Sequence, residues 1–258
     1  MRLMKRILSA AAVLALSASL LVGCSSGTAS SVPVSASSAA ESTVSSVEET
    51  ASSAVDENEA AAAQLLNDLT GSYQELWPVI LADKYQQTWL DDCAALVGEE
   101  NAEAAFEKLS SMVTGDVYGE DAVEAYANGG GAYFCGFTNS LATLTFDGET
   151  STISGTDKDG NVLFSHTYHY IGMEPVRGLY EFESDDADSG EFTYFFLAPD
   201  TSAETYHIEF RYGSDADALS QYDAGDYAYW VASGISTDCD QTMIDNCIEL
   251  FCTENLAG

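Results

Sequence analysis

The chain has 258 residues, 46% of them hydrophobic and 11% aromatic, so it can bury a sizeable core, and global disorder is excluded. Its formal net charge is −34, from 8 Lys and Arg against 42 Asp and Glu. Arg2, Lys5 and Arg6 lie in the first six residues, and without them the net charge is −37. A surface of that sign repels phosphate backbones and anionic lipid head groups, which excludes nucleic-acid binding and electrostatic attachment to a membrane.

Residues 1–23 are predicted to be a lipoprotein signal peptide. A charged stretch, Met1–Arg6, precedes the apolar run Ile7–Val22, which is too short and too rich in Ala and Ser for a permanent membrane span. The run ends in Leu21-Val22-Gly23-Cys24, the pattern of a bacterial lipobox. This pattern predicts cleavage before Cys24 and lipidation of its sulfur; an ordinary signal peptide that happens to contain a cysteine is the alternative.

Residues 24–57 are predicted to be a disordered tether, because Ser, Ala, Val, Thr and Glu dominate them and no aromatic residue is present. Residues 58–258 then form the folded domain. We therefore expect an extracytoplasmic protein that is held to the bacterial cell membrane by the lipid on Cys24.

The first part of the folded domain, from Asn58 to about Tyr126, has a helical pattern. Trp89, Cys93 and Leu96 recur at helical spacing and are expected on one face. Helices are predicted over the segments Ala60–Leu69, which Gly71 would end, and Tyr85–Val97, Ala102–Val113 and Glu120–Ala127. A final helix is predicted over Gln241–Phe251.

After Gly129-Gly130-Gly131 the hydrophobic period changes to two, which is typical of strands. Six short strands are predicted, over Tyr133–Phe137, Ala142–Phe146, Val162–Tyr170, Leu179–Glu183, Glu191–Leu197 and Thr205–Tyr212. Asp147-Gly148 and Asp159-Gly160-Asn161 are signals for hairpin turns. Strands joined by turns without intervening helices indicate an antiparallel meander that closes as a barrel or a sandwich.

Beyond Cys24 the chain has five cysteines, so at least one stays unpaired even in an oxidising compartment. They are Cys93, Cys135, Cys239, Cys247 and Cys252. The absence of a Cys-x-x-Cys pair argues against a thioredoxin-like site or a zinc ribbon. We interpret them as mostly buried thiols.

The chain has three histidines. His166 and His169 fall on opposite faces of one predicted strand, so they cannot bind one ion, and each is interpreted as a polar strand residue. His207 shares a strand face with Glu209 and Arg211, where residues i and i+2 lie about 6–7 Å apart. From this spacing His207 and Glu209 can converge on one cation; the alternative is a solvent-facing strand on which Glu209 pairs with Arg211.

The sequence carries no catalytic motif. It lacks a nucleophile elbow, a phosphate loop and a dinucleotide fingerprint. The acidic turn Asp157–Val162 lacks the Gly and the terminal Glu of an EF-hand and is interpreted as a hairpin turn. Nothing singles out a pair of catalytic carboxylates, and we expect a binding protein rather than an enzyme.

The order of several segments resembles the ZinT (YodA-like) family of zinc-binding proteins. Gly71-Ser72-Tyr73-Gln74-Glu75-Leu76-Trp77-Pro78 is similar to its opening Gly-x-Trp-x-x-x-Tyr-Pro motif. Tyr168-His169-Tyr170-Ile171-Gly172 and the segment Val176–Glu183 are similar to its Tyr-x-Tyr-x-Gly and Gly-Val-Arg-Tyr-Leu-Phe-Glu motifs. Tyr227–Ile235 and the helix after it resemble the closing part of the family. The resemblance spans about Leu65–Phe251.

The resemblance implies a lipocalin-like (calycin) β-barrel, decorated by short helices and followed by a C-terminal helix. It also implies a site for zinc or cadmium built from three histidines. The His-x-His motif of the family falls on His207 and Glu209, and its loop histidine falls near Asp200. The implied ligand set is thus His207, Glu209 and Asp200, in which carboxylates replace two imidazoles and favour harder ions.

The leading hypothesis from the sequence is a lipid-anchored, extracytoplasmic protein that captures a divalent metal, zinc first, for uptake or buffering. A zinc-uptake transporter with its solute-binding protein is the expected partner. The alternative is a barrel that has lost its metal site and binds a small organic ligand through its tyrosines.

Overall fold

The computed structural model describes residues 57–199 and 207–256. The chain divides into two units, Met1–Asp56 and Glu57–Gly258, and the described residues all belong to the second unit. The predicted signal peptide, Cys24, most of the tether and Asp200 lie outside the described residues.

Eight antiparallel strands form a closed barrel in which each strand pairs with its neighbours in the sequence and β1 pairs with β8. The strands are β1 (Gly71–Glu75), β2 (Thr143–Asp147), β3 (Thr152–Thr156), β4 (Val162–Met173), β5 (Tyr180–Ser184), β6 (Tyr194–Leu197), β7 (His207–Gly213) and β8 (Ala232–Ser236). The prediction of an antiparallel barrel is confirmed. Closure removes every free sheet edge.

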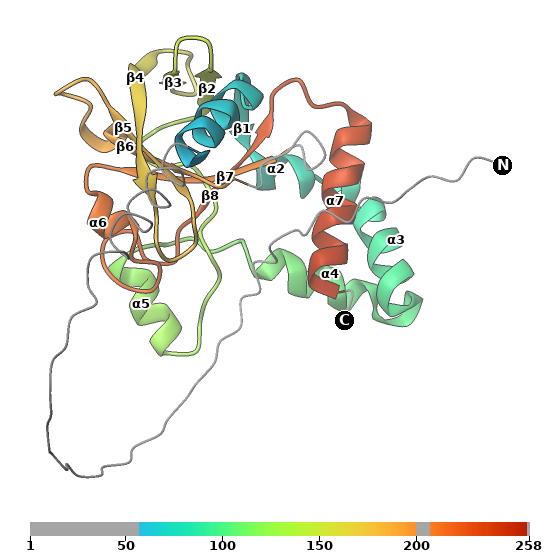
Figure 1. The fold of residues 1–258 in the computed structure, drawn as a ribbon. Helices are drawn as coiled ribbons and strands as arrows, with labels where there is room; N and C mark the ends of the chain where they lie inside the picture. Colours follow the sequence, from blue (N-terminus) through green and yellow to red (C-terminus); the bar gives the residue numbers. More distant parts are fainter. Residues whose placement is uncertain (1–56, 200–206, 257–258) are drawn as a thin grey trace, which may run out of the picture. The chain divides into compact units, whose positions relative to one another are not determined.

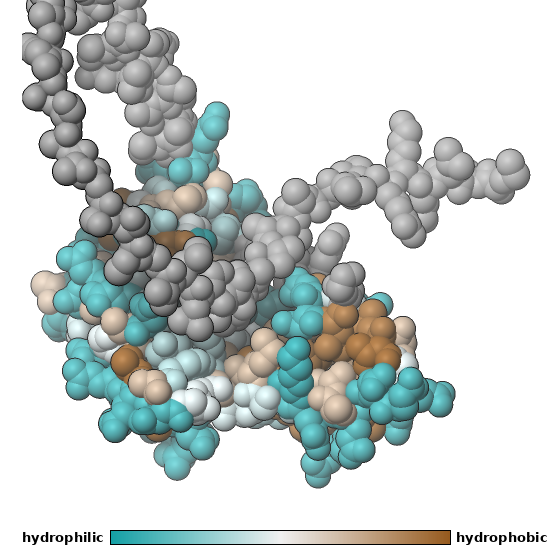
Figure 2. Space-filling model, turned by 90° about the horizontal axis from the view of Figure 1, so that it is seen from below, coloured by the Kyte–Doolittle hydropathy of each residue, from teal (hydrophilic) through white to brown (hydrophobic). Residues whose placement is uncertain are grey.

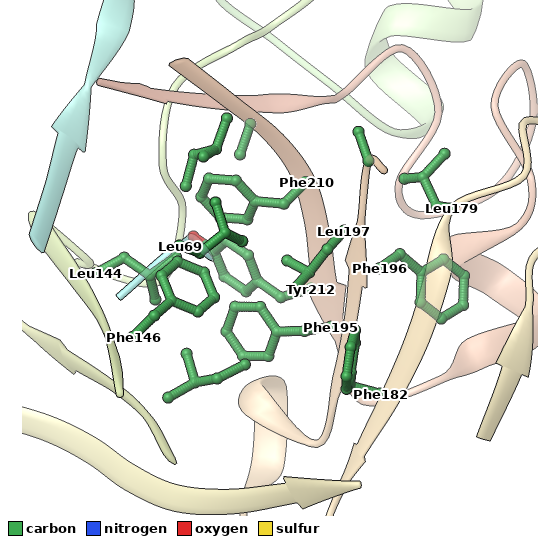
Figure 3. Close-up of a cluster of buried hydrophobic side chains, with 14 of the residues drawn as sticks. Leu69, Leu144, Phe146, Leu179, Phe182, Phe195, Phe196, Leu197, Phe210 and Tyr212 are labelled. Atoms are coloured by element: carbon green, nitrogen blue, oxygen red, sulfur yellow. The ribbon is translucent and has the colours of Figure 1, made fainter. Parts of the chain in front are cut away.

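Alternating residues of the strands fill the interior of the barrel with aromatic rings. The Phe195 ring lies between those of Tyr168 and Tyr212, with centroids 5.4 Å from each. Figure 3 shows Phe195, Tyr212 and Phe210 turned to the same side, and Phe196 turned to the other side of β6. All four are buried. The chain's own side chains therefore occupy the space in which a lipocalin-like barrel could hold a ligand.

Helices precede, interrupt and follow the barrel. The described residues begin with a helix over residues 57–68. The later α-helices are α2 (Leu76–Ile80), α3 (Gln86–Val97), α4 (Ala102–Ser111), α5 (Glu120–Ala127), α6 (Ala216–Leu219) and α7 (Gln241–Leu256). The helices α3, α4 and α7 lie together on one side of the barrel (Figure 1). Their apolar faces form a second core, in which Trp89, Cys93, Cys247 and Ile248 are fully buried.

Three short strands were not predicted from the sequence. The strands β1, β3 and β8 contain mostly small or polar residues, so their hydrophobic alternation is weak. Gly71, expected to end the first helix, instead begins β1 after that helix has stopped at residue 68. Pairing with a neighbouring strand, which a local pattern does not reveal, decides the structure of these segments.

One predicted strand was wrong. The segment Tyr133–Phe137 is not a strand; it contributes isolated bridges from Phe134 to Thr114 and to Trp230. Trp89, Cys93 and Leu96 share one face of α3, as expected, but Leu96 is 39% exposed and does not join the other two in the core.

The visible surface is mostly hydrophilic (Figure 2), in agreement with the acidic composition of the chain. Hydrophilic residues dominate the face in Figure 2, with one apolar patch on the side where α3, α4 and α7 lie. Within residues 57–199 and 207–256, no helix is both long and apolar enough to cross a membrane.

Candidate metal centre

Strand β7 presents two different faces. Ile208, Phe210 and Tyr212 point into the barrel and are buried. His207 and Glu209 alternate with them on the outer face and are half-buried. The predicted alternation is therefore present, and the imidazole and the carboxylate come from adjacent positions of one strand face.

The C-terminal helix packs against this face at His207. The His207 ring lies 5.4 Å from the ring of Phe251 on α7, centroid to centroid. Phe251 in turn lies 4.8 Å from the ring of Trp77 on α2. One side of the His207 ring therefore faces an aromatic, apolar surface, and Phe251 restricts the rotation of the imidazole towards that side.

Glu209 lies beside strand β8 and a buried thiol. Its register partner on β8 is Ser233, whose N–H donates to the carbonyl of Cys135 at 3.0 Å. Burial, and then the Glu209 carboxylate, raise the pKa of Cys135 to about 12. At neutral pH and without a metal ion this thiol is therefore protonated.

The alternative interpretation was a solvent-facing strand on which Glu209 pairs with Arg211. The position of Arg211 is not consistent with it. Its side chain is fully buried, and its guanidinium donates to the carbonyls of Leu219 and Tyr227. It also lies 4.4 Å above the Tyr222 ring. Burial lowers the pKa of Arg211 to about 10, so it stays charged at neutral pH and fastens the loop after α6 to the barrel.

Two of the three predicted ligands thus share one face, and the third cannot be placed. Asp200 lies in the connection between β6 and β7, outside the described residues. The described part of that connection is tied to Glu209, because the Ala198 N–H donates to the Glu209 carbonyl at 3.0 Å. Within residues 57–199 and 207–256, no three His, Cys, Asp or Glu side chains are grouped closely enough to hold a metal ion.

No family model and no curated protein matches the chain. Two solved structures have a similar fold. One is the Zn(II)-bound ZinT-like domain of Streptococcus pneumoniae AdcA, with 16% identity, a TM-score of 0.45, and coverage of 71% of this chain and 89% of that domain.

The other is Zn(II)-bound AdcA from the same organism, with 16% identity, a TM-score of 0.41, and coverage of 75% of this chain. This chain spans only 35% of that protein. At this identity the likeness to the ZinT-like domain is one of fold alone, and the zinc belongs to those two structures of AdcA.

The other two histidines have carboxylate partners. His166 Nδ1 lies 2.7 Å from Asp186 Oδ2, and His169 Nδ1 lies 2.8 Å from Asp185 Oδ1. They point to opposite sides of β4, as the alternation predicted. These pairs were not predicted, because the acidic loop after β5 meets β4 only through the pairing of the two strands. Each histidine meets a different aspartate, so they do not form a common site.

An acidic pocket of about 280 Å³ is lined by residues of both α3 and α7. It is lined by Thr88, Asp91, Asp92, Asp245 and Glu249. Burial, followed by the charges of Glu249, Asp245 and Asp91, raises the pKa of Asp92. The spacing of Asp245 and Glu249 at i and i+4 was the one available signal for it in the sequence.

The turn Asp157–Asn161 is a hairpin turn, as expected. The Asp157 carboxylate accepts hydrogen bonds from the backbone N–H groups of Asp159 and Asn161, both at 2.9 Å. A hydrogen bond from the Asn161 side chain has the largest effect on the pKa of Asp157, and together with the backbone hydrogen bonds it lowers that pKa. Its oxygens are thus directed at the turn itself.

Proposed function

We propose that this chain is an extracytoplasmic, lipid-anchored protein that binds a divalent metal ion, zinc first, through His207, Glu209 and Asp200. The observation that carries the proposal is the position of His207 and Glu209 side by side on the outer face of β7. Imidazole nitrogen and carboxylate oxygen are both ordinary zinc ligands. The anchor is the lipid on Cys24.

The ligand set determines which ions are expected. One imidazole with two carboxylates is harder than three imidazoles, so zinc affinity falls and tolerance of Mn²⁺, Fe²⁺ and Ca²⁺ rises. Cadmium, a softer ion, is expected to bind less well than zinc.

Charge supports capture of a cation. Without the first six residues the chain carries 42 acidic residues against five basic ones, and a field of that sign raises the local concentration of cations and their association rate. Captured metal can be buffered at the membrane or passed to the solute-binding protein of a zinc-uptake transporter, and we propose no catalytic role.

The alternative, an organic ligand inside the barrel, is less well supported. Buried rings from β4, β6 and β7 contact one another across the interior, as with Phe195 and Tyr212. A ligand would have to displace these rings, at the cost of their packing.

Elemental analysis tests the proposal. A chain that starts at Ser25 keeps all described residues and lacks the lipid; it is loaded with zinc, desalted and analysed. We expect about one equivalent of zinc in the parent, a loss in His207→Ala, and retention in the matched control His169→Ala. Equal retention in both variants would place the zinc elsewhere, and no zinc in the parent, with micromolar binding also absent, would reject metal binding.

A further inference from the structure

Two buried cysteines meet between the helices α3 and α7. Cys93 and Cys252 are 0% exposed, and their Sγ atoms lie 3.7 Å apart. They are separated by 159 positions in the sequence. A disulfide bond is about 2.05 Å long, so the two sulfur atoms need to approach by less than 2 Å.

We propose that Cys93 and Cys252 are a disulfide-forming pair that fastens α7 to α3 in an oxidising medium. The inference rests on the contact between the two sulfur atoms and does not depend on metal binding. It also states which of the five cysteines pair: Cys93 and Cys252 form the bond, and Cys135, Cys239 and Cys247 remain thiols.

The pair is buried, but its position gives an oxidant a route to it. Cys252 lies in the last turns of α7, which ends at Leu256, and helix ends open more readily than helix centres. Burial raises the pKa of both thiols. The pair is therefore unreactive while α7 is closed and can be oxidised when its end opens or while the chain folds.

The oxidant is a disulfide, either a small one such as oxidised glutathione or that of an oxidoreductase. The Cys252 thiolate attacks one sulfur of this disulfide, forms a mixed disulfide and releases one thiol. The Cys93 thiolate then attacks Cys252 Sγ and releases the second thiol. The two cysteines lose two protons and two electrons, and the oxidant accepts both electrons and leaves as two thiols.

The bond would restrain the helix that covers the outer face of β7. Cys252 directly follows Phe251, whose ring contacts those of His207 and Trp77. Closing a loop of this length restricts the unfolded chain strongly, which stabilises the folded one. The disulfide would thus keep Phe251 against His207.

Refolding in a glutathione buffer tests the pair without requiring access to the folded core. The chain from Ser25 is unfolded in urea under reduction and refolded in reduced and oxidised glutathione. We expect the loss of two free thiols, and a cross-linked peptide that joins Cys93 to Cys252 in the mass spectrum. The oxidised chain should melt roughly 5–10 °C above the reduced chain.

The variants separate this pair from general oxidation. Cys93→Ala and Cys252→Ala should lose both the cross-link and the gain in melting temperature. Cys247→Ala, which removes another fully buried thiol of α7, should keep both. A wild-type chain that refolds with five free thiols, or with Cys93 joined to a different cysteine, would overturn the proposal even if a variant fails to fold.

Discussion

The inside of the barrel and the helical layer beside it are both buried, but they are built differently. Aromatic rings from many strands fill the barrel, and Phe195 alone contacts four of them. The helical layer around Trp89 combines a few aromatic rings with aliphatic side chains and includes the thiols Cys93, Cys247 and Cys252. The barrel core is filled by ring packing, whereas the helical layer also brings together thiols and, at its surface, carboxylates.

Strand β7 belongs to both regions, which explains where the candidate site lies. Its inner residues, such as Phe210, are held by the barrel core, and its outer residues, such as His207, face α7. The strand thus presents two candidate ligands to the helical layer on a backbone that the closed barrel holds in place. Rigid presentation of ligands lowers the cost of ordering them when an ion binds.

The largest effect is expected from a cavity in the barrel. Phe195→Ala removes a fully buried ring, and we expect a loss of about 3–5 kcal/mol in the free energy of unfolding. Urea denaturation followed by circular dichroism measures it. Ile171→Ala, at a position 41% exposed, is the control and should change stability far less; equal losses would contradict the solid core described here.

A smaller effect is expected in the helical layer. The Trp89 indole N–H donates to the Ile80 carbonyl at 2.8 Å, and Trp89→Phe leaves this buried carbonyl without its partner. We expect a loss of about 1–3 kcal/mol in the same denaturation experiment.

Trp77→Phe is the matched control for that bond. The buried indole nitrogen of Trp77 has no well-aligned hydrogen-bond acceptor among the described residues. Its replacement removes ring volume without breaking such a bond and should cost less than Trp89→Phe. The reverse order would show that packing, and not the hydrogen bond, holds α3 to α2.

Sequence patterns revealed the parts of the fold that local hydrophobic spacing determines. The helices α3, α5 and α7 begin within a residue of their predicted positions, and β4 and β7 show the expected alternation. The strands β1, β3 and β8 escaped detection because pairing, and not their own residues, makes them strands.

The same division applies to the candidate site. The i and i+2 spacing of His207 and Glu209 can be read from the chain, so their common face was predictable. The contacts with Phe251 on α7 and with the Cys135 segment join residues dozens of positions apart. No periodicity encodes such contacts, and they required the folded structure.

The smallest effect is expected in the acidic pocket, through pH. The pKa of Asp92 is raised in the folded chain, so its ionisation destabilises the fold as pH rises from the unfolded value of about 4. Asp92→Asn cannot ionise and should be more stable than the parent at pH 7, by less than about 1 kcal/mol because the pocket is open to solvent.

The pH dependence distinguishes this effect from a general loss of charge. The gain from Asp92→Asn should fade as pH falls towards 4, where the parent carboxylate becomes protonated in both states. Thermal melts from pH 4 to pH 8 measure it. Asp238→Asn, at an exposed position outside the pocket, is the control; an identical pH profile in both variants would reject the repulsion within the pocket.

The central claim is that zinc binds to the outer face of β7, and X-ray absorption at the zinc edge tests it most directly. We predict nitrogen and oxygen ligands at about 2.0–2.2 Å, with an imidazole contribution that disappears in His207→Ala and persists in His169→Ala. An imidazole contribution that is unchanged in His207→Ala, or lost in His169→Ala, would contradict the claim, because it would place the metal away from β7.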